Sequence, residues 1–304
     1  GLSRDYNLFL YQRGGDRWKY EGRDYAGTKY ADLMQDESFA KYFDYMEIGY
    51  DTNIALDAFK YMCRFYTDYS FPVTFDGANR FRTGEMPILI ADAVSMYNQL
   101  TVFATEIRGL WMFANVPGTK RSDGTISSVA IAGVSAVVMM NGVEDPEASW
   151  RFMKWQVGSD VQSTYGNSMV SLIGPSAKYN TANMGALFKM SWTSEEYANL
   201  YAQFNNLATI PNYPGAYIID RYLNFAFLNA YNDGAEPVEQ LQGYVKTINV
   251  EITRKRKEFD LPVLEDGETV DDSIETYLEY LKKLSPEELA NYSEYVQNYV
   301  NGLK

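Results

Sequence analysis

The sequence predicts a helix-rich α/β protein, because amphipathic helical patterns alternate with a few short apolar runs that are typical of buried strands. The chain has 304 residues, of which 46% are hydrophobic and 22% are charged, close to the average of globular proteins. We therefore expect a buried core. The length is enough for one large domain or two ordinary ones.

The clearest helix is expected over residues 52–68, where apolar side chains recur on one face and Thr52 can cap the first turn. Another begins at Pro146, and its expected inner stripe is Ala148, Phe152 and Trp155. Further helices are expected at 94–105, from 159 to a stop at Gly166, from 194, at 219–232, from 237, and twice after the linker 261–272, the second after Ser285.

Three apolar runs predict short buried strands at residues 86–91, 111–116 and 136–140. Residues 24–50 are rich in tyrosine and acidic side chains without a clean period, so they are interpreted as an irregular surface segment.

Charge and composition exclude several classes of protein. The net charge is −13 and the pI is about 4.6, so no nucleic-acid partner is expected. The basic run 254–257 closes an expected helix, where cations complement the helix dipole. The absence of histidine rules out Ser-His-Asp, Cys-His and HExxH chemistry. We expect no cofactor and no metal, and the single Cys63 is interpreted as a core residue.

Five stretches, taken in order and spacing, resemble the extracellular solute-binding proteins of ABC importers, in the large carbohydrate-binding branch (family 1). They are FLYQRGGD at 9–16, FRTGEMPI at 81–88 with IAD at 90–92 and YNQL at 97–100, VPGT at 116–119 with DGTI at 123–126, EASWRFMKW at 147–155, and EITRKRKEF at 251–259. The resemblance covers residues 6–260, and residues 24–50 depart from it.

The resemblance implies a periplasmic-binding-protein-like (type II) fold, in which two α/β lobes close on a ligand. It implies an incomplete bilobal receptor made of residues 1–260, mostly the C-terminal lobe, with residues 90–105 and 222–260 belonging to or packing on the N-terminal lobe. Residues 261–304 are expected to be an acidic linker and a helical C-terminal extension. The implied ligand is a mono- or oligosaccharide, the implied partner is the importer's membrane permease, and the implied location is extracellular, as a membrane-anchored lipoprotein.

A sugar site needs flat aromatic faces and planar polar groups, gathered where strands end. Asp92 follows an expected strand and is either a ligand-binding carboxylate or the N-cap of the next helix. Tyr97 and Asn98 lie on the first turns of that helix. Trp111 starts the next expected strand and either binds ligand or packs in the core.

Two further pairs of candidate residues contain a glycine or lie beside one. Gly133 and Ser135 flank Val134 where backbone amides could approach a ligand, although Gly133 could instead mark a bulge. Tyr11 and Gln12 precede a double glycine at what resembles a cleft edge.

Tyr217 and Arg221 flank Asp220 after a Pro-Gly turn and resemble the family's late cleft segment. The alternative for this pair is a surface ion pair between Arg221 and Asp220.

Two other function classes stay open. A glycosidase would use two carboxylates, but with 40 acidic residues a close pair is inevitable and proves nothing. A carbohydrate-binding module outside transport would share the aromatic site without needing a hinge.

Overall fold

The computed structural model describes residues 2–20, 27–43, 46–264 and 268–303. Helices account for more than half of these residues and the strands form small two-stranded sheets, so the helix-rich class is confirmed. The chain divides into two compact units. Unit 1 is Gly1–Ser70 with Ile210–Lys304, and unit 2 is Phe71–Thr209.

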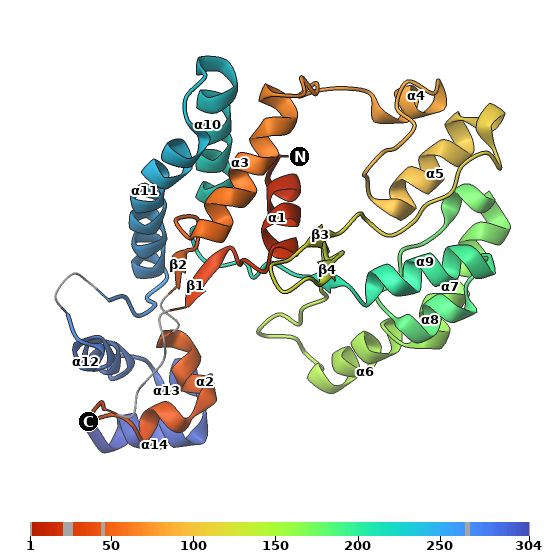
Figure 1. Ribbon diagram of the computed structural model, residues 1–304. Helices are drawn as coiled ribbons and strands as arrows, with labels where there is room; N and C mark the ends of the chain where they lie inside the picture. Colours follow the sequence, from red (N-terminus) through yellow and green to blue (C-terminus); the bar gives the residue numbers. More distant parts are fainter. Residues whose placement is uncertain (1, 21–26, 44–45, 265–267, 304) are drawn as a thin grey trace. The chain divides into compact units, whose positions relative to one another are not determined.

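Four helices make the main body of unit 1 (Figure 1). They are α1 (Leu2–Gln12), α3 (Asn53–Thr67), α10 (Tyr217–Asp233) and α11 (Pro237–Glu258). Tyr6 is fully buried between them and meets the rings of Tyr50 and Phe59 edge-to-face, at 5.1 and 5.7 Å between centroids. The body is therefore built from two parts of the chain that are separated in sequence by the whole of unit 2.

Helix α3 begins and ends close to the predicted bounds. The Thr52 hydroxyl accepts a hydrogen bond from the backbone N–H of Ala55 (3.3 Å), which satisfies one free donor of the first turn. Most of its predicted apolar stripe, Cys63 included, is buried, but Ile54 at its start is 41% exposed. A short antiparallel pair, β1 (Trp18–Tyr20) and β2 (Met46–Ile48), precedes it.

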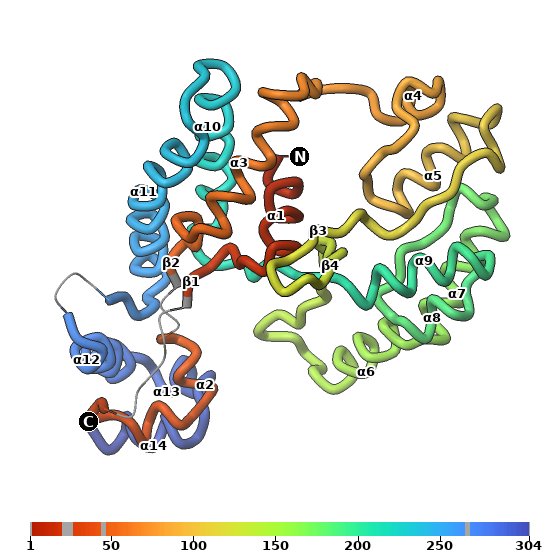
Figure 2. The backbone as a smooth tube through the Cα atoms, in the orientation of Figure 1, coloured from red at the N-terminus to blue at the C-terminus, as the bar shows by residue number. Residues whose placement is uncertain are grey.

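A second cluster in unit 1 joins residues 27–43 to the C-terminal helices. It contains η1 (Leu33–Gln35), α2 (Glu37–Ala40), η2 (Lys41–Phe43), α12 (Val270–Leu281), α13 (Pro286–Leu289) and α14 (Glu294–Leu303). Figure 2 shows these red-orange and blue segments side by side. Phe39 and Phe43 are fully buried against Tyr277.

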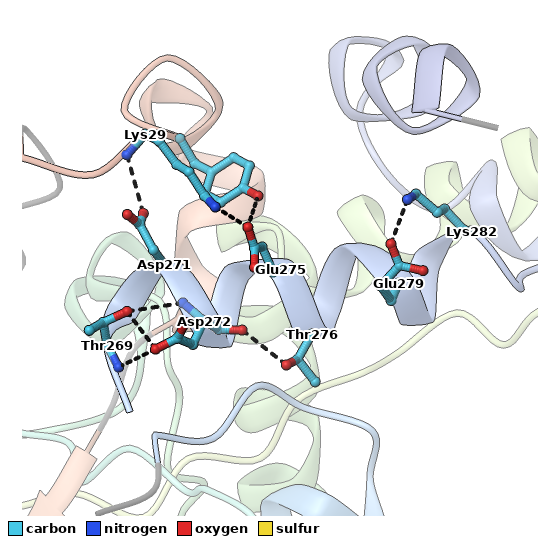
Figure 3. Close-up of polar contacts among 9 residues, drawn as sticks. Lys29, Thr269, Asp271, Asp272, Glu275, Thr276, Glu279 and Lys282 are labelled. Carbon is cyan, nitrogen blue, oxygen red and sulfur yellow. Dashed lines mark hydrogen bonds and ion pairs between the residues drawn. The ribbon is translucent and has the colours of Figure 1, made fainter. Parts of the chain in front are cut away.

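Polar contacts fix α12 to the N-terminal segment (Figure 3). The Lys29 backbone N–H donates to Asp271 (3.2 Å), the Lys29 ammonium pairs with Glu275, and the Tyr30 hydroxyl donates to Glu275 (3.0 Å). The interpretation of residues 24–50 as an irregular surface segment is therefore wrong for 27–43, because these residues bury aromatic rings under helices that no local pattern connects to them. Residues 24–26 and 44–45 lie outside the described part.

Unit 2 consists of short helices with little strand. Its helices are α4 (Gly77–Arg82), α5 (Ala93–Phe103), η3 (Thr105–Ile107), α6 (Pro146–Gln156), α7 (Ser159–Ile173), η4 (Pro175–Ala177), α8 (Met184–Lys189) and α9 (Ser194–Phe204). The antiparallel pair is β3 (Thr119–Lys120) with β4 (Ile126–Ser127), and the parallel pair is β5 (Ala130–Ile131) with β6 (Leu207–Ala208).

The three predicted buried strands are wrong. Residues 86–91, 111–116 and 136–140 lie wholly within the described part of the chain, and none of them is a strand. They are irregular in backbone structure. Residues 136–140 are exposed and 86–91 largely so, with Ile88 77% and Val138 72% exposed, whereas residues 111–116 are mostly half-buried. An apolar run becomes a strand only where a neighbouring strand completes its hydrogen bonds, and no described segment pairs with these runs.

Two helix details also differ from prediction. Helix α7 does not stop at Gly166 but runs on to Ile173, because Gly166 is buried against Met190 and Tyr179 and serves close packing rather than termination. The predicted inner stripe of α6 is exposed, with Phe152 at 57% and Trp155 at 58%.

The units divide the segments that the resemblance assigned to one lobe. Residues 90–105 lie in unit 2, whereas residues 222–260 lie in unit 1. Among the described residues, no helix combines the length and the apolar character needed to span a bilayer.

Replacing Phe39 by Ala should lower the free energy of unfolding by about 3 to 5 kcal/mol, since it empties a closed aromatic cluster. Urea denaturation measures this change. The matched control is Tyr295→Ala on α14, whose ring is half exposed and whose loss should change stability by less than about 0.5 kcal/mol. Equal, small effects of both variants would contradict the packing of residues 27–43 against the C-terminal helices.

Candidate functional site

Helix α5 presents two of the predicted site residues. The Asp92 carboxylate accepts from the Ser95 backbone N–H (2.8 Å), so Asp92 is the N-cap of α5. Tyr97 and Asn98 follow on the helix. The Asn98 amide donates to the backbone carbonyl of Lys178 (2.8 Å), which ties α5 to the segment after α7.

Tyr97 is the centre of an aromatic cluster. Its ring meets Trp111 and Trp192 edge-to-face at 5.6 Å between centroids, and Phe113 at 6.2 Å. Phe113 also meets Trp192 edge-to-face, at 6.2 Å. Four rings from three separate segments are thus held in the mutual geometry that aromatic quadrupoles favour.

A hollow of about 430 Å³ opens beside this cluster. That volume suits a small ligand such as one or two sugar rings. Its walls come from α5, from residues 108–113 and from the start of α9. They are formed by Tyr97, Leu100, Thr101, Arg108, Gly109, Trp111, Met112, Phe113, Pro175, Thr193, Glu195, Glu196 and Asn199.

The walls combine aromatic faces with free polar groups. Arg108 and Glu195 are exposed at the hollow and supply one positive and one negative charge. The Asn199 amide N–H donates to the carbonyl of Phe113 (2.9 Å), which leaves its oxygen as an acceptor. Hydroxyl groups that both donate and accept suit such a set.

Behind the wall, Lys178 forms an ion pair with Glu196. Lys178 is only 9% exposed, and its Nζ lies 3.2 Å from the Glu196 carboxylate and 2.9 Å from the Ser191 carbonyl. The same ammonium lies 3.9 Å from the centroid of the Trp192 ring and 4.8 Å from that of Tyr97. The ammonium group is therefore surrounded by a carboxylate, a carbonyl and two ring faces.

The pKa values follow from this pairing. Burial lowers the pKa of Lys178 despite the opposing effect of Glu196. Burial would raise the pKa of Glu196, but the Thr193 backbone N–H, Lys178 and the Tyr97 hydroxyl together hold it below its ordinary value. Burial, with the nearby charge and hydrogen bond of Glu196, raises the pKa of Tyr97 to about 12. At neutral pH Glu196 is therefore ionised and Tyr97 is neutral.

The structure brings only some of the predicted site residues together. Tyr97 and Trp111 line the hollow, and Asn98 supports it from behind. Trp111 also packs on the small cluster of Ala78, Leu100 and Ala104, so the core role suggested for it is present. Its ligand-binding role stays a prediction. Asp92 caps a helix and does not line the hollow.

Gly133 and Ser135 lie in an exposed extended segment of unit 2 and do not line the hollow. Gly133 lies outside the described strands, so it marks no bulge, and it has open space where a side chain would stand. The approach of its backbone amide to a ligand stays a prediction.

The remaining four predicted residues belong to unit 1. The Tyr11 hydroxyl donates to Asp16 (2.9 Å), and Gln12 is buried at the end of α1. The Tyr217 hydroxyl donates to Glu251 (2.9 Å), and Arg221 is exposed.

The suggested ion pair of Arg221 with Asp220 is wrong. Asp220 instead accepts from Arg17 (2.9 Å) and from the Ser3 hydroxyl (2.7 Å). Ser3 and Arg17 lie in the N-terminal segment, far from Asp220 in the sequence. Sequence spacing does not predict contacts of this kind.

The sequence analysis missed Lys178, Trp192 and Glu196. The capping box of Thr193 and Glu196 was visible in the sequence, and the structure confirms it. The same Glu196 carboxylate also forms an ion pair with Lys178. The capping pattern in the sequence does not indicate this second partner. Across the described ranges, no group of three or more acidic or cysteine side chains is placed to hold a metal ion.

No protein-family model matches this sequence, and no curated protein is significantly similar to it.

Replacing Glu196 by Gln should lower the free energy of unfolding by about 1.5 to 3 kcal/mol at pH 7, because the substitution removes the negative charge that pairs with the buried ammonium group of Lys178. The folded-state pKa of Glu196 is below its ordinary value of 4.5, so its contribution is complete above that pH and fades as the pH falls further. The difference in free energy of unfolding between wild type and Glu196→Gln should therefore become smaller below pH 4.5. Urea titrations at several pH values measure this difference.

The matched control is Glu195→Gln, the exposed neighbour, which should change stability by less than about 0.5 kcal/mol. A gap for Glu196→Gln that stays constant down to pH 3 would contradict the ion pair.

Proposed function

We propose that this chain is part of an extracytoplasmic solute receptor for an ABC-type importer and that a saccharide binds in the hollow of unit 2. The observation that carries the proposal is the meeting of Tyr97, Trp111 and Phe113 beside Arg108, Glu195 and Asn199. Ring faces suit the C–H side of a sugar, and the polar groups suit its hydroxyls. The five motif stretches support the receptor class, including its periplasmic-binding-protein-like fold.

The wider parts of the proposal follow from the same motifs. The implied partner is the membrane permease of the importer, and the implied location is outside the cytoplasmic membrane, with a lipid anchor. Glu196 is not suited to act as a general acid, because a general acid needs a raised pKa, whereas that of Glu196 is lowered.

A thermal-shift screen of the chain against a panel of neutral mono- and oligosaccharides tests the proposal. A sugar present at about a hundred times its dissociation constant should stabilise the folded state by about 2.7 kcal/mol. Chromatography of the recovered sugar should show no hydrolysis. Turnover of the sugar would favour a glycosidase, and no stabilisation by any sugar in the panel would contradict the proposal.

For a sugar that binds, Trp111→Ala should raise the dissociation constant about tenfold or more, which corresponds to about 1.4 kcal/mol of lost stacking. Trp111→Phe should lie between the variant and wild type, because it keeps a ring. Isothermal titration calorimetry measures both. The control is Trp150→Ala, an exposed ring on α6 that does not line the hollow. Equal weakening by the control would place the sugar elsewhere.

A further inference from the structure

We propose that Lys178 is the positioning residue of the hollow: its buried ammonium group holds Trp192, Tyr97 and Glu196 in place without itself facing the ligand. The proposal deepens the function proposed above and rests on the hollow being the ligand site. Neither Lys178 nor Trp192 lines the hollow, whereas Tyr97 and Glu196 do. Lys178 therefore acts on the walls from behind.

Lys178 joins three segments that share no secondary structure. Through its backbone carbonyl it accepts from Asn98 on α5 (2.8 Å). Through Nζ it donates to the Ser191 carbonyl (2.9 Å), next to Trp192, and to Glu196 on the first turn of α9 (3.2 Å). The walls of the hollow come from two of these segments, α5 and α9, so one residue fixes their separation.

The ammonium also sets the orientation of the rings. It lies over Trp192 at 3.9 Å and over Tyr97 at 4.8 Å, distances at which a desolvated cation attracts a ring face strongly. Tyr97 in turn touches Trp111 and Phe113, the two other rings of the wall. A change at Lys178 should therefore reach Trp111, with which no contact of Lys178 is seen, by way of Tyr97.

Apolar packing beside the hollow is limited. The apolar cluster of the unit consists of Ala78, Leu100 and Ala104, with four larger side chains packed around it. Deep burial of a lysine is costly unless the charge is paired and solvated by the protein. The buried ammonium group is stable only where a carboxylate, a carbonyl and ring faces surround it. The same arrangement of these groups sets the shape of the hollow.

The test is ¹⁹F NMR of the protein labelled with 5-fluorotryptophan, with Trp192 and Trp111 assigned through Trp192→Phe and Trp111→Phe. In Lys178→Met, both the Trp192 and the Trp111 resonances should move. The matched control is Lys154→Met: Lys154 lies over Trp150 at 5.5 Å on an exposed helix face and should affect neither resonance. A moved Trp192 with an unmoved Trp111 would overturn the positioning role.

A pH titration of the wild type supplies a second readout. The Trp192 resonance should titrate with a midpoint below 10.5, the ordinary pKa of lysine, since burial lowers the pKa of Lys178. Tyr97, with a pKa of about 12, stays neutral up to pH 11, and Glu196 stays charged throughout. No titration of Trp192 between pH 7 and 11 would overturn the contact.

If Lys178→Met fails to fold, Glu196→Gln keeps the proposal testable. Loss of the opposing charge should move the midpoint of the Trp192 titration to still lower pH, and an unchanged midpoint would contradict the pairing. All these measurements are made without a sugar. A negative result in these NMR measurements therefore does not decide the saccharide screen, and a negative screen does not decide the NMR measurements.

Discussion

The main body of unit 1 exists only because two distant parts of the chain close on each other. Helices α1 and α3 come before unit 2 in the sequence and α10 and α11 come after it, yet they share one buried cluster. Polar contacts span the same closure. Arg17 pairs with Asp220 (2.9 Å), and the Trp18 indole N–H donates to the Pro211 carbonyl (3.2 Å). Unit 2 is thus inserted in the sequence between elements that pack on each other in unit 1.

Within unit 2 those contacts are mainly polar and aromatic. Helix α6 buries none of its residues, and the extended run at 136–140 is exposed. The segments around the hollow are instead held by the Lys178–Glu196 pair, by the capping box at Thr193 and by the edge-to-face rings around Tyr97. Directional interactions of this kind specify one arrangement, which is what a ligand site requires.

Local patterns in the sequence predicted those features, such as helix caps and helix ends, that depend on neighbouring residues. The cap of α3, the helix expected from residue 194 and the end of α10 near residue 232 are all as expected, because each depends on residues within a turn or two. Tyr97 and Trp111 were found because aromatic side chains near expected element ends are natural ligand contacts. The strand at 136–140 failed because β-branched composition cannot supply a pairing partner.

What the sequence could not predict is long-range pairing. Nothing in residues 27–43 indicates that Phe39 and Phe43 meet Tyr277, and nothing near Lys178 indicates Glu196 and Trp192. A lone lysine in an irregular segment has no period to analyse, and a charged side chain is usually exposed. These contacts appear only when the fold places the segments together.

The most direct test of the account is hydrogen–deuterium exchange with and without a saccharide that stabilises the protein. The account predicts that added protection concentrates at α5, at residues 108–113 and at the first turn of α9, the segments that line the hollow. Protection confined to unit 1, at residues 3–17 and 217–221, would contradict it, because the ligand would then bind away from the Tyr97 cluster.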